Sequence, residues 1–406
     1  MMRQVVFMIV VGLVSGIVAC GGGAPQQEVT GETLSKGLMA ALAVLEKGPD
    51  GKPVPQPARL GILTQTNGEW SWSEIEDGDS NVFHKAMVYS PSEGVSGILT
   101  AGGTKAMLKL RVGDNEPELL WEADFGGKWS RMRDIEVADI YGDGTATIVV
   151  ATHDQGVVAT VRPGKDGTWE VTELDRQENT VVHEVEVGDL DGDGVLEIYA
   201  TPSAPNKLDG TPQPGWVTRY VPAAGEGGVI VADLGDRHAK EILVDDIDGD
   251  GTDELYGALE AVAGGQVEIL RYDAETDPAG GITVATLPDT LCRFLTAGDI
   301  DGDGVKEMVA AAHKSGLWLI RPRVDGPWRV TLIDGESGGF EHAALLTDLD
   351  GDGVDELYVA NDKGGEINRY VHTEAGLEKE TLFVYPAGLS GFTWNLMPVP
   401  VDLIPG

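Results

Sequence analysis

Short apolar segments with the composition of β-strands recur along most of the chain, and clusters of Gly, Asp and Asn separate them. Val185–Val187 and Glu197–Ala200, for example, flank a Gly- and Asp-rich turn and read as two strands. Another strand recurs at intervals of about 50 residues. Its copies are Arg59–Leu63, Ala106–Leu110, Val157–Val161, Trp216–Tyr220, Val267–Leu270, Leu317–Ile320 and Ile367–Tyr370. The pattern predicts an all-β chain of seven similar units with four strands each.

One nine-residue stretch, Asp189–Glu197, marks the units most clearly. Near-copies of it begin at Asp246, Asp299 and Asp348, and a degenerate copy begins at Asp139. Successive starts lie 50, 57, 53 and 49 residues apart. A nearly fixed period of this length is typical of a repeat architecture of the propeller kind.

The stretch has the ligand chemistry of a calcium loop. Carboxylates at positions 1, 3 and 5 supply hard oxygen ligands, Gly at position 6 permits a sharp turn, and positions 7 and 9 can add a carbonyl and a Glu carboxylate. A helix–loop–helix calcium site also needs Glu at position 12, which is Ala or Gly or Val here. We therefore predict about four calcium ions in loops between strands, with metal-free Asp-Gly turns as the alternative. The expected ligands are Asp189, Asp191, Asp193, Val195 and Glu197; Asp246, Asp248, Asp250, Thr252 and Glu254; Asp299, Asp301, Asp303, Val305 and Glu307; and Asp348, Asp350, Asp352, Val354 and Glu356.

The succession of strand, Asp-x-Asp-x-Asp-Gly-x-x-Glu/Asp loop and strand resembles FG-GAP or VCBS-type repeats, the class that includes the integrin α-chain propeller. The resemblance covers about residues 60–402. It implies a seven-bladed β-propeller over residues 59–406 whose two ends share one composite blade, because closure removes free sheet edges. Eight blades would need an undetected repeat, and six would leave one unit outside the ring. The resemblance does not specify a function, since this fold serves adhesion, glycan enzymes and scaffolds.

By the same resemblance, the strand before each loop is the innermost strand of its blade. Six residues before the first Asp of each loop, five successive units carry a cationic or ionisable base. These bases are Arg133, His183, Lys240, Arg293 and His342. The aligned positions of the two outer units are Phe83, with His84 next to it, and Leu396. In one interpretation the bases surround a mouth of the central channel and bind an anion, such as a uronate or sialate carboxylate.

In the other interpretation, each base forms an ion pair with an acid of the next blade. Neighbouring positions on a strand face opposite sides, so a ring of such pairs is physically reasonable. The acids beside the bases are Asp134, Glu184, Glu241 and Glu341. Arg293 and His342 are followed by Phe and Ala instead of an acid, which keeps the anion-binding interpretation open.

Histidine can also act as a catalytic base. Glycan lyases on related propellers use histidine, so His183 and His342 are the candidate catalytic residues. His153, His313 and His372 follow later strands and read as loop residues. The sequence contains no nucleophile elbow, phosphate loop or cysteine–histidine pair, which favours a module without catalytic activity.

Three tryptophans share one local setting. Trp70, Trp169 and Trp328 each follow a hairpin turn of the Asn-Gly or Asp-Gly type, in which Gly supplies the positive φ. Packing of an outer strand is the favoured interpretation, and stacking on a sugar is the alternative.

The N-terminal residues have the pattern of a targeting segment. Arg3 precedes the apolar run Val5–Val18, which is too short for a comfortable transmembrane helix. Residues 1–19 read as a signal peptide, and Ile17–Cys20 resembles a bacterial lipobox with Cys20 as the lipidated residue. A plain secretory signal is the alternative. Gly21 after the cysteine favours the outer membrane, by resemblance to the Gram-negative sorting pattern.

Residues 20–58 are predicted to form a tether, because they contain a Gly run and a Pro-rich run. Within them, Glu32–Lys47 places leucines near one face of a short helix, with Gly48 after it. Cys292 has no partner for a disulfide if Cys20 is lipidated, and we expect it to be a buried small apolar residue.

The formal net charge of −38 argues against nucleic acid or an anionic membrane as a direct partner. Membrane contact is expected only through the lipid on Cys20. The sequence therefore predicts a calcium-stabilised module at the cell surface or in the periplasm that binds a protein or a glycan. The alternative is a polysaccharide lyase or dehydratase that acts on an anionic sugar at the channel mouth.

Overall fold

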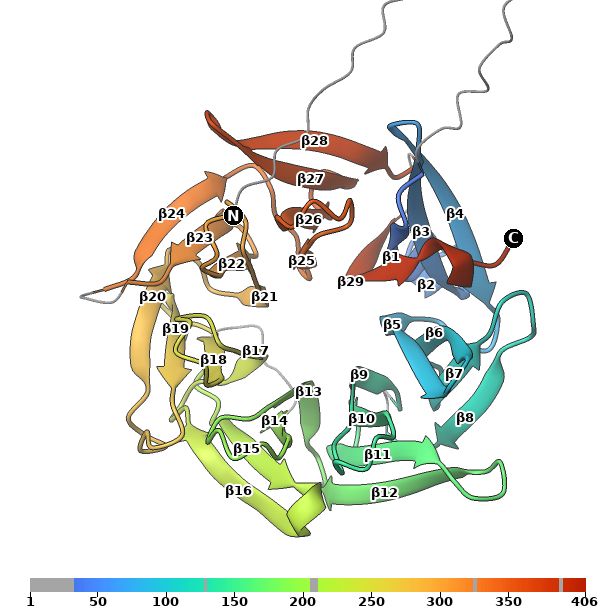
Figure 1. Ribbon diagram of the computed structural model, residues 1–406, viewed down its shortest axis with the longest axis horizontal. Coiled ribbons are helices and arrows are strands. Elements are labelled where there is room, and N and C mark those ends of the chain that lie inside the picture. Colours follow the sequence, from blue (N-terminus) through green and yellow to red (C-terminus); the bar gives the residue numbers. More distant parts are fainter. Residues whose placement is uncertain (1–32, 128–129, 205–210, 324–326, 387–389) are drawn as a thin grey trace, which may run out of the picture.

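Seven β-sheets surround a central axis like the blades of a propeller (Figure 1). The computed structural model describes residues 33–127, 130–204, 211–323, 327–386 and 390–406. The predicted signal peptide of residues 1–19 and the lipidation site Cys20 lie outside the described residues. The all-β, seven-bladed architecture predicted from the repeats is confirmed.

Six of the sheets contain four consecutive antiparallel strands. In each of these blades the first strand is innermost and the fourth is outermost (Figure 1). The strands are β5 (Phe83–Ser92), β6 (Val95–Gly102), β7 (Ala106–Arg111) and β8 (Glu118–Ala123); β9 (Met132–Ala138), β10 (Thr147–Thr152), β11 (Val157–Pro163) and β12 (Trp169–Arg176); β13 (Val181–Gly188), β14 (Glu197–Ser203), β15 (Trp216–Val221) and β16 (Glu226–Asp233); β17 (Ala239–Asp245), β18 (Glu254–Leu259), β19 (Val267–Tyr272) and β20 (Ile282–Leu287); β21 (Cys292–Gly298), β22 (Glu307–Ala312), β23 (Gly316–Arg321) and β24 (Arg329–Asp334); and β25 (Ala344–Thr347), β26 (Glu356–Asn361), β27 (Glu366–Thr373) and β28 (Gly376–Val384). Two short 3₁₀ helices are η1 (Pro222–Ala224) and η2 (Val401–Leu403).

The seventh blade joins the two ends of the described chain, as predicted. Its strands are β29 (Ser390–Pro400), β1 (Lys36–Lys47), β3 (Ala58–Thr66) and β4 (Glu69–Asp77), and β2 (Pro53–Pro55) pairs with the end of β1. β29 and β1 are antiparallel and lie side by side in the ring (Figure 1). This pairing gives the seventh blade its innermost strand and closes the propeller.

The short helix predicted for Glu32–Lys47 is wrong, because the described part of this segment contains the strand β1. Its leucines have helical spacing, but the residues between them are apolar as well, and Leu38 to Val44 are all buried. A strand that packs on both faces has a continuous apolar run, and periodicity alone cannot distinguish it from a buried helix. The propeller therefore begins with β1, and not at residue 59.

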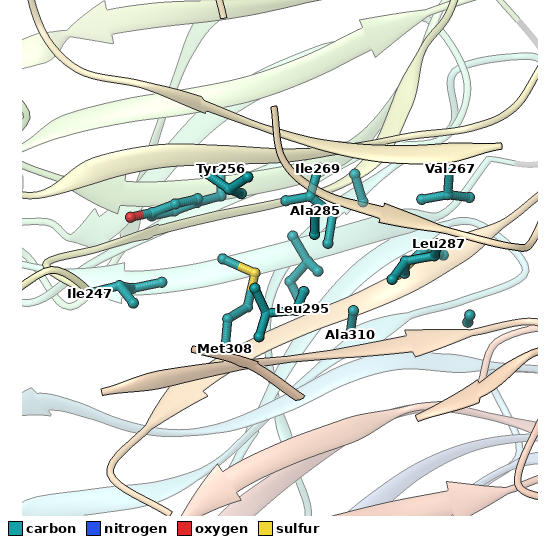
Figure 2. Packing of buried hydrophobic residues seen from close by; sticks show 14 residues of the cluster. Ile247, Tyr256, Val267, Ile269, Ala285, Leu287, Leu295, Met308 and Ala310 are labelled. Carbon is teal, nitrogen blue, oxygen red and sulfur yellow. The ribbon is translucent and has the colours of Figure 1, made fainter. Parts of the chain in front are cut away.

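The hydrophobic core lies between the blades. Figure 2 shows one such layer, in which Tyr256 and Ile269 of one blade face Leu295 and Met308 of the next. Cys292 is buried in the same cluster, as predicted. Among the described residues, no helix has the length and hydrophobicity that crossing a bilayer requires.

The direction of the strands gives the molecule two different faces. Each innermost strand of the Asp-loop blades runs toward its Asp-rich loop, so these loops lie together on one face. The innermost strands begin at the opposite face, together with the connections between blades. We call this second face the mouth face, because the first residues of the innermost strands surround the axis there (Figure 1).

We predict that shortening one buried side chain of the closing strand β29 destabilises the whole propeller. Leu396 of β29 is 1% exposed and packs against Leu38 and Tyr358 in a core cluster. Leu396→Ala should lower the free energy of unfolding by about 2–5 kcal/mol, measured by urea denaturation. Val384→Ala, at a position that is 63% exposed, is the control and should change it by less than about 0.5 kcal/mol. Equal effects of the two variants would contradict a structural role for the closure.

Candidate functional site

The candidate bases lie at β-bulges. Six of the seven innermost strands leave one or two residues unpaired against the second strand of the blade, near the mouth face. A bulge changes the direction of the side chain that it carries, and bulges are common beside binding sites. The residues at these bulges are His84 in β5, Arg133 in β9, His183 in β13, Lys240 in β17, Arg293 in β21 and Trp394 in β29. We call them the bulge ring.

Four members of the bulge ring were found by counting from the Asp loops, and two were not. The count gives Phe83 in place of His84, and Leu396 in place of Trp394. Phe83 and Leu396 are instead core residues of their blades. The signal that locates the ring is the bulge, which depends on the register between two strands and is not visible in one strand alone.

His342 lies apart from the bulge ring. It precedes β25, has a φ of 55° and is fully buried. Its Nδ1 lies 2.8 Å from the carbonyl oxygen of Ala312, and its Nε2 lies 2.8 Å from the hydroxyl of Ser337. Burial lowers the pKa of His342 to about 4. Because both ring nitrogens have protein partners, we assign this histidine a structural role.

Arg293 behaves as the ion-pair interpretation expects. Its guanidinium lies 3.2 Å from a carboxylate oxygen of Glu260 and 3.4 Å from one of Glu341. It also lies over the ring of Phe340, 4.5 Å from the centroid. Glu260 follows β18 and Glu341 precedes β25, so Arg293 joins the blades on both sides of its own. Sequence reasoning named Glu341 but missed Glu260, whose position relative to the repeat gives no signal.

Arg133, His183 and Lys240 behave differently. In the part of the chain that the structure describes, none of the three side chains makes a hydrogen bond or an ion pair with another residue. Both ring nitrogens of His183 are buried without a partner, and its side chain is only 4% exposed. Lys240 is 7% exposed, and the guanidinium of Arg133 lies over the ring of Trp394 at 5.0 Å.

The pKa values of these groups reflect crowding of positive charge in a place with little water. Burial, and then the charge of Arg293, lowers the pKa of Lys240 to about 7. Burial, followed by the charges of Lys240 and Arg133, holds the pKa of His183 well below its usual range. His183 lies on a blade between those of Arg133 and Lys240, so the three groups influence one another around the channel.

The acids next to these bases make other contacts. Asp134 accepts a hydrogen bond from the backbone N–H of Val185 and lies 3.1 Å from Nζ of Lys85. Glu241 accepts a hydrogen bond from the backbone N–H of Leu295. Each acid therefore binds the next blade through its backbone, because its strand position faces away from that of the base. The predicted inter-blade ion pairs are replaced here by carboxylate-to-backbone bonds. Among the described residues, Arg133 and Lys240 have no carboxylate at ion-pair distance, and Glu260 and Glu341 act on Lys240 from further away.

Acids of the innermost strands form a further group of buried charges. Burial raises the pKa of Glu136, Glu184, Glu186 and Glu241, and Lys85 is the cation near them. The pKa of Lys85 is well above its usual value because, although burial opposes its charge, the surrounding carboxylates favour it. Next to the bases of the bulge ring, the innermost strands thus carry a second group of interacting charges.

Aromatic side chains cover one side of the mouth. Phe340, Phe392 and Trp394 form a continuous contact, with ring centroids 6.0 Å apart in each neighbouring pair. The edge of His84 meets Trp394 at 4.6 Å, and Arg133 and Arg293 lie over the two ends of this row. We call the three residues the aromatic row.

A cavity of about 440 Å³ opens beside the ring on the mouth face. Its lining includes Gln213, His238, Glu260, His313 and Phe340. Nε2 of His238 lies 3.2 Å from a carboxylate oxygen of Glu260. Although burial opposes the charge of Glu260, its contact with His238 and the charge of Arg293 lower its pKa, so it is an ionised carboxylate. His238 and Glu260 were not among the sequence-predicted site residues.

On the other face, the four Asp loops bring their carboxylates together. The first, third and fifth positions of each loop place oxygen atoms within 4.8 Å of one another, and Glu254 joins the group in its loop. The glycines at positions 4 and 6 have positive φ in all four loops, for example 69° at Gly192 and 84° at Gly194. These backbone angles let the backbone N–H groups of Asp193 and Gly194 bind Asp189. A set of carboxylate oxygens of this kind fits calcium.

The Glu at position 9 of the loops has protein partners. Glu254 accepts hydrogen bonds from the hydroxyl of Tyr256 at 2.7 Å and from Arg271 at 3.0 Å, and Arg271 also lies 2.6 Å from Asp248. Glu197, Glu307 and Glu356 likewise lie near an Arg of the third strand. In the degenerate loop, Arg162 lies over Tyr141 and binds Asp143 at 2.6 Å, so a protein cation neutralises one of the two remaining acids.

The repeated tryptophans pack between neighbouring blades. Trp169 contacts Tyr89 of the preceding blade, and its Nε1 donates a hydrogen bond to Glu118 at 2.7 Å. Trp328 contacts Tyr256 of the preceding blade in the same way. These contacts agree with outer-strand packing, which the sequence favoured over stacking on a sugar.

Comparison with known proteins agrees with this geometry. The model of the FG-GAP-like repeat matches residues 139–200 and 299–359. The first range contains the degenerate loop and the loop that begins at Asp189. The second contains the loops that begin at Asp299 and Asp348. The chain is therefore a seven-bladed β-propeller with FG-GAP-like repeats. No curated protein matches it in sequence.

Several solved structures share the fold. The Pseudomonas aeruginosa periplasmic gluconolactonase PpgL is 15% identical, with a TM-score of 0.55 over 90% of this chain and 99% of that chain. A protein from Lactobacillus plantarum is 12% identical, with a TM-score of 0.53 over 91% of this chain and 100% of its own. The Dos1 propeller is 7% identical, with a TM-score of 0.52 over 85% of this chain and 84% of its own. At these identities the likeness shows the fold alone.

We predict that Lys240 reduces stability in a pH-dependent way. Its folded pKa of about 7 lies below the ordinary value of 10.5, so between these pH values the unfolded chain binds a proton that the folded chain has released. The cost of burying the cation is therefore complete below about pH 7 and disappears as the pH rises toward 10.5. Lys240→Met should raise the free energy of unfolding at pH 6 by on the order of 3–5 kcal/mol, and by less at pH 9.5.

Urea denaturation at the two pH values measures this gain. The matched control is Lys165→Met, which replaces an exposed lysine in the turn between β11 and β12 and should show no such pH dependence. A gain for Lys240→Met that is equal at both pH values would contradict the lowered pKa.

Proposed function

We propose that this propeller is a binding module whose channel mouth receives an anionic group of a protein or glycan partner. The observation that carries the proposal is the group formed by Arg133, His183 and Lys240. Their positively charged or ionisable side chains gather at one mouth, two of them nearly fully buried, without a carboxylate partner among the described residues. Such an arrangement lowers stability, and groups of this kind concentrate at binding sites.

A carboxylate fits the mouth better than a neutral ligand does. It would lie near Lys240 and the guanidinium of Arg133, and charged hydrogen bonds of this type are roughly twice as strong as neutral ones. It would also raise the pKa of Lys240, so binding at neutral pH takes up a proton. The aromatic row offers an apolar surface next to the charge, which suits the face of a sugar ring or an aromatic side chain.

A second candidate function is that of a lyase or dehydratase on an anionic sugar. It is favoured by His183, whose lowered pKa keeps the imidazole neutral and able to accept a proton at neutral pH. In such a reaction His183 would remove the proton from the carbon next to the carboxylate, and a double bond would form from this carbon to the next. The C–O bond of that next carbon would break, and the leaving oxygen would keep the electron pair and take up a proton from water. Arg133 and Lys240 would stabilise the negative charge that develops on the carboxylate.

The proposal includes four calcium ions in the loops that begin at Asp189, Asp246, Asp299 and Asp348. The clustered carboxylates of these loops support it. The role of the ions would be structural, since the loops lie on the face opposite to the channel mouth. Bound calcium stabilises the folded state by mass action and would hold the ends of the innermost strands.

The proposal also assigns the module to the cell envelope. Its support is the sequence of Met1–Cys20, which has the pattern of a lipoprotein signal. In this arrangement Cys20 carries the lipid, and the propeller projects from the membrane into the periplasm or the exterior.

We predict that the full-length protein binds acidic glycans through the mouth. A glycan array with uronate-, sialate- and neutral-sugar probes, followed by calorimetric titration, should show acidic binders that lose about 10–100-fold in affinity with Lys240→Ala. Lys165→Ala is the matched control and should bind like the wild type. Binding of neutral and acidic probes alike would contradict an anion site, and binding of acidic peptides alone would identify a protein as the partner.

The same titrations separate the two candidate functions. A binding module returns the glycan unchanged, whereas a lyase or dehydratase yields an unsaturated product that absorbs ultraviolet light. His183→Ala should abolish such turnover if it is present.

We predict that calcium raises the melting temperature. Chelation should lower the midpoint of a calorimetric scan, and added calcium should restore it, because a ligand at 100 times its Kd stabilises by about 2.7 kcal/mol. Asp250→Ala should remove one ion from the bound stoichiometry. Asp143→Ala in the degenerate loop is the control and should leave the calcium content unchanged. An equal midpoint with and without chelator would refute calcium as a stabilising ligand.

A further inference from the structure

The cavity beside the bulge ring shares two residues with the surroundings of the mouth. Phe340 lines the cavity and also belongs to the aromatic row, where Arg293 lies over its ring. Glu260 lines the cavity and also forms the ion pair with Arg293. The cavity and the channel mouth are therefore neighbouring spaces on one face. A ligand longer than a single sugar can reach from one space to the other across Phe340.

The cavity differs from the mouth in its chemistry. Arg237 lies in its lining, but its guanidinium contacts Glu268 and donates hydrogen bonds to the backbone carbonyls of Leu259, Glu260 and Gln266. The charges of Arg237 and Glu260 are thus compensated within the protein, and the two other charged residues of the lining, the exposed Asp236 and Lys314, have opposite signs. An anion gains little in such a place, while a neutral group with hydroxyls meets hydrogen-bonding side chains and an aromatic ring.

His238 lines the cavity with an imidazole ring. Its Nε2 lies 3.2 Å from a carboxylate oxygen of Glu260, without the geometry of a hydrogen bond. The ring nitrogens of an imidazole can donate hydrogen bonds to the hydroxyls of a ligand or accept them. Gln213 lines the same cavity, and its amide Nε2 donates a hydrogen bond to the carbonyl oxygen of Ala204 at 3.5 Å. Acceptors and donors of this kind, next to an aromatic face, are the usual surroundings of a sugar ring.

The size of the cavity also favours a small ligand over a protein surface. At about 440 Å³ it falls within the range of about 300–1000 Å³ that is typical of small-molecule sites. A flat protein interface does not need an enclosed space of this size.

We infer that the ligand is an acidic oligosaccharide of at least two residues, with its carboxylate at the channel mouth and the next sugar in the cavity beside His238 and Phe340. This inference rests on the proposed anion site and names the class of ligand for it. The sugar in the cavity contributes hydroxyl contacts and stacking, and the uronate at the mouth contributes charge. Affinity should therefore rise from a monosaccharide to a disaccharide of the same sugar.

Calorimetric titration of the full-length protein tests this with two pairs of probes, galacturonate with digalacturonate and mannuronate with dimannuronate. For at least one pair, the disaccharide should bind about tenfold or more tightly than the monosaccharide, which corresponds to about 1.4 kcal/mol. Ala263→Trp introduces a large side chain at an exposed position of the cavity lining. It should reduce the affinity for the disaccharide to that for the monosaccharide.

His238→Ala should reduce the same gain, because it removes a hydrogen-bonding ring from the cavity lining. His372→Ala is the matched control, since His372 is an exposed histidine of β27, and it should bind both probes like the wild type. Lys240→Ala should weaken the binding of both probes.

The outcomes separate this inference from the proposed function. Equal affinity for both members of a pair, with loss of binding in Lys240→Ala, would overturn the cavity as a sugar site and leave the anion site standing. A disaccharide gain that persists in Ala263→Trp would place the second sugar elsewhere and would also overturn it. Absence of binding for all four probes would overturn the inference together with a uronate as the ligand of the mouth.

Discussion

The pairing of β29 with β1 is the constraint on which the rest of the structure depends. It joins the two ends of the described chain into one blade and converts a row of repeats into a closed ring. It also completes the candidate site, because β29 carries Phe392 and Trp394 into the aromatic row at the channel mouth. Stability and the shape of the mouth are therefore linked through one strand.

The innermost strands use the alternation of side chains for two purposes. Bulged residues such as His183 and Lys240 face the mouth, while the neighbouring acids turn toward the next blade. Asp134 and Glu241 bind backbone N–H groups of the adjacent innermost strand, so the acids hold the blades together. This arrangement leaves Arg133 and Lys240 without a carboxylate partner among the described residues. A cationic mouth in a chain with a net charge of −38 is thus a local result of strand geometry.

The two faces of the propeller have separate tasks in the proposed function. The Asp loops gather carboxylates where the innermost strands end, and the bulge ring gathers bases where they begin. In that proposal, a cation bound at one end would stiffen the strands that present the bases at the other. Protein cations also neutralise acids of the Asp loops, since Arg271 binds Asp248 and Arg162 binds Asp143.

The sequence by itself determined the repeat, the Asp loops and the seven-bladed ring, because these depend on residue types at short, regular spacing. It also located Arg133, His183, Lys240 and Arg293 by counting from the loops. Four further features needed the tertiary structure, since each depends on contacts between distant segments. The first is the strand β1, whose two buried faces give a pattern that resembles a helix, and the second is Trp394, which a register shift brings into the ring. The third is His342, which the hydroxyl of Ser337 and the carbonyl of Ala312 hold in the core. The fourth is the contact of Glu260 with His238, which come from different loops. Local spacing encodes which groups repeat, and only strand pairing across the ring decides which of them meet.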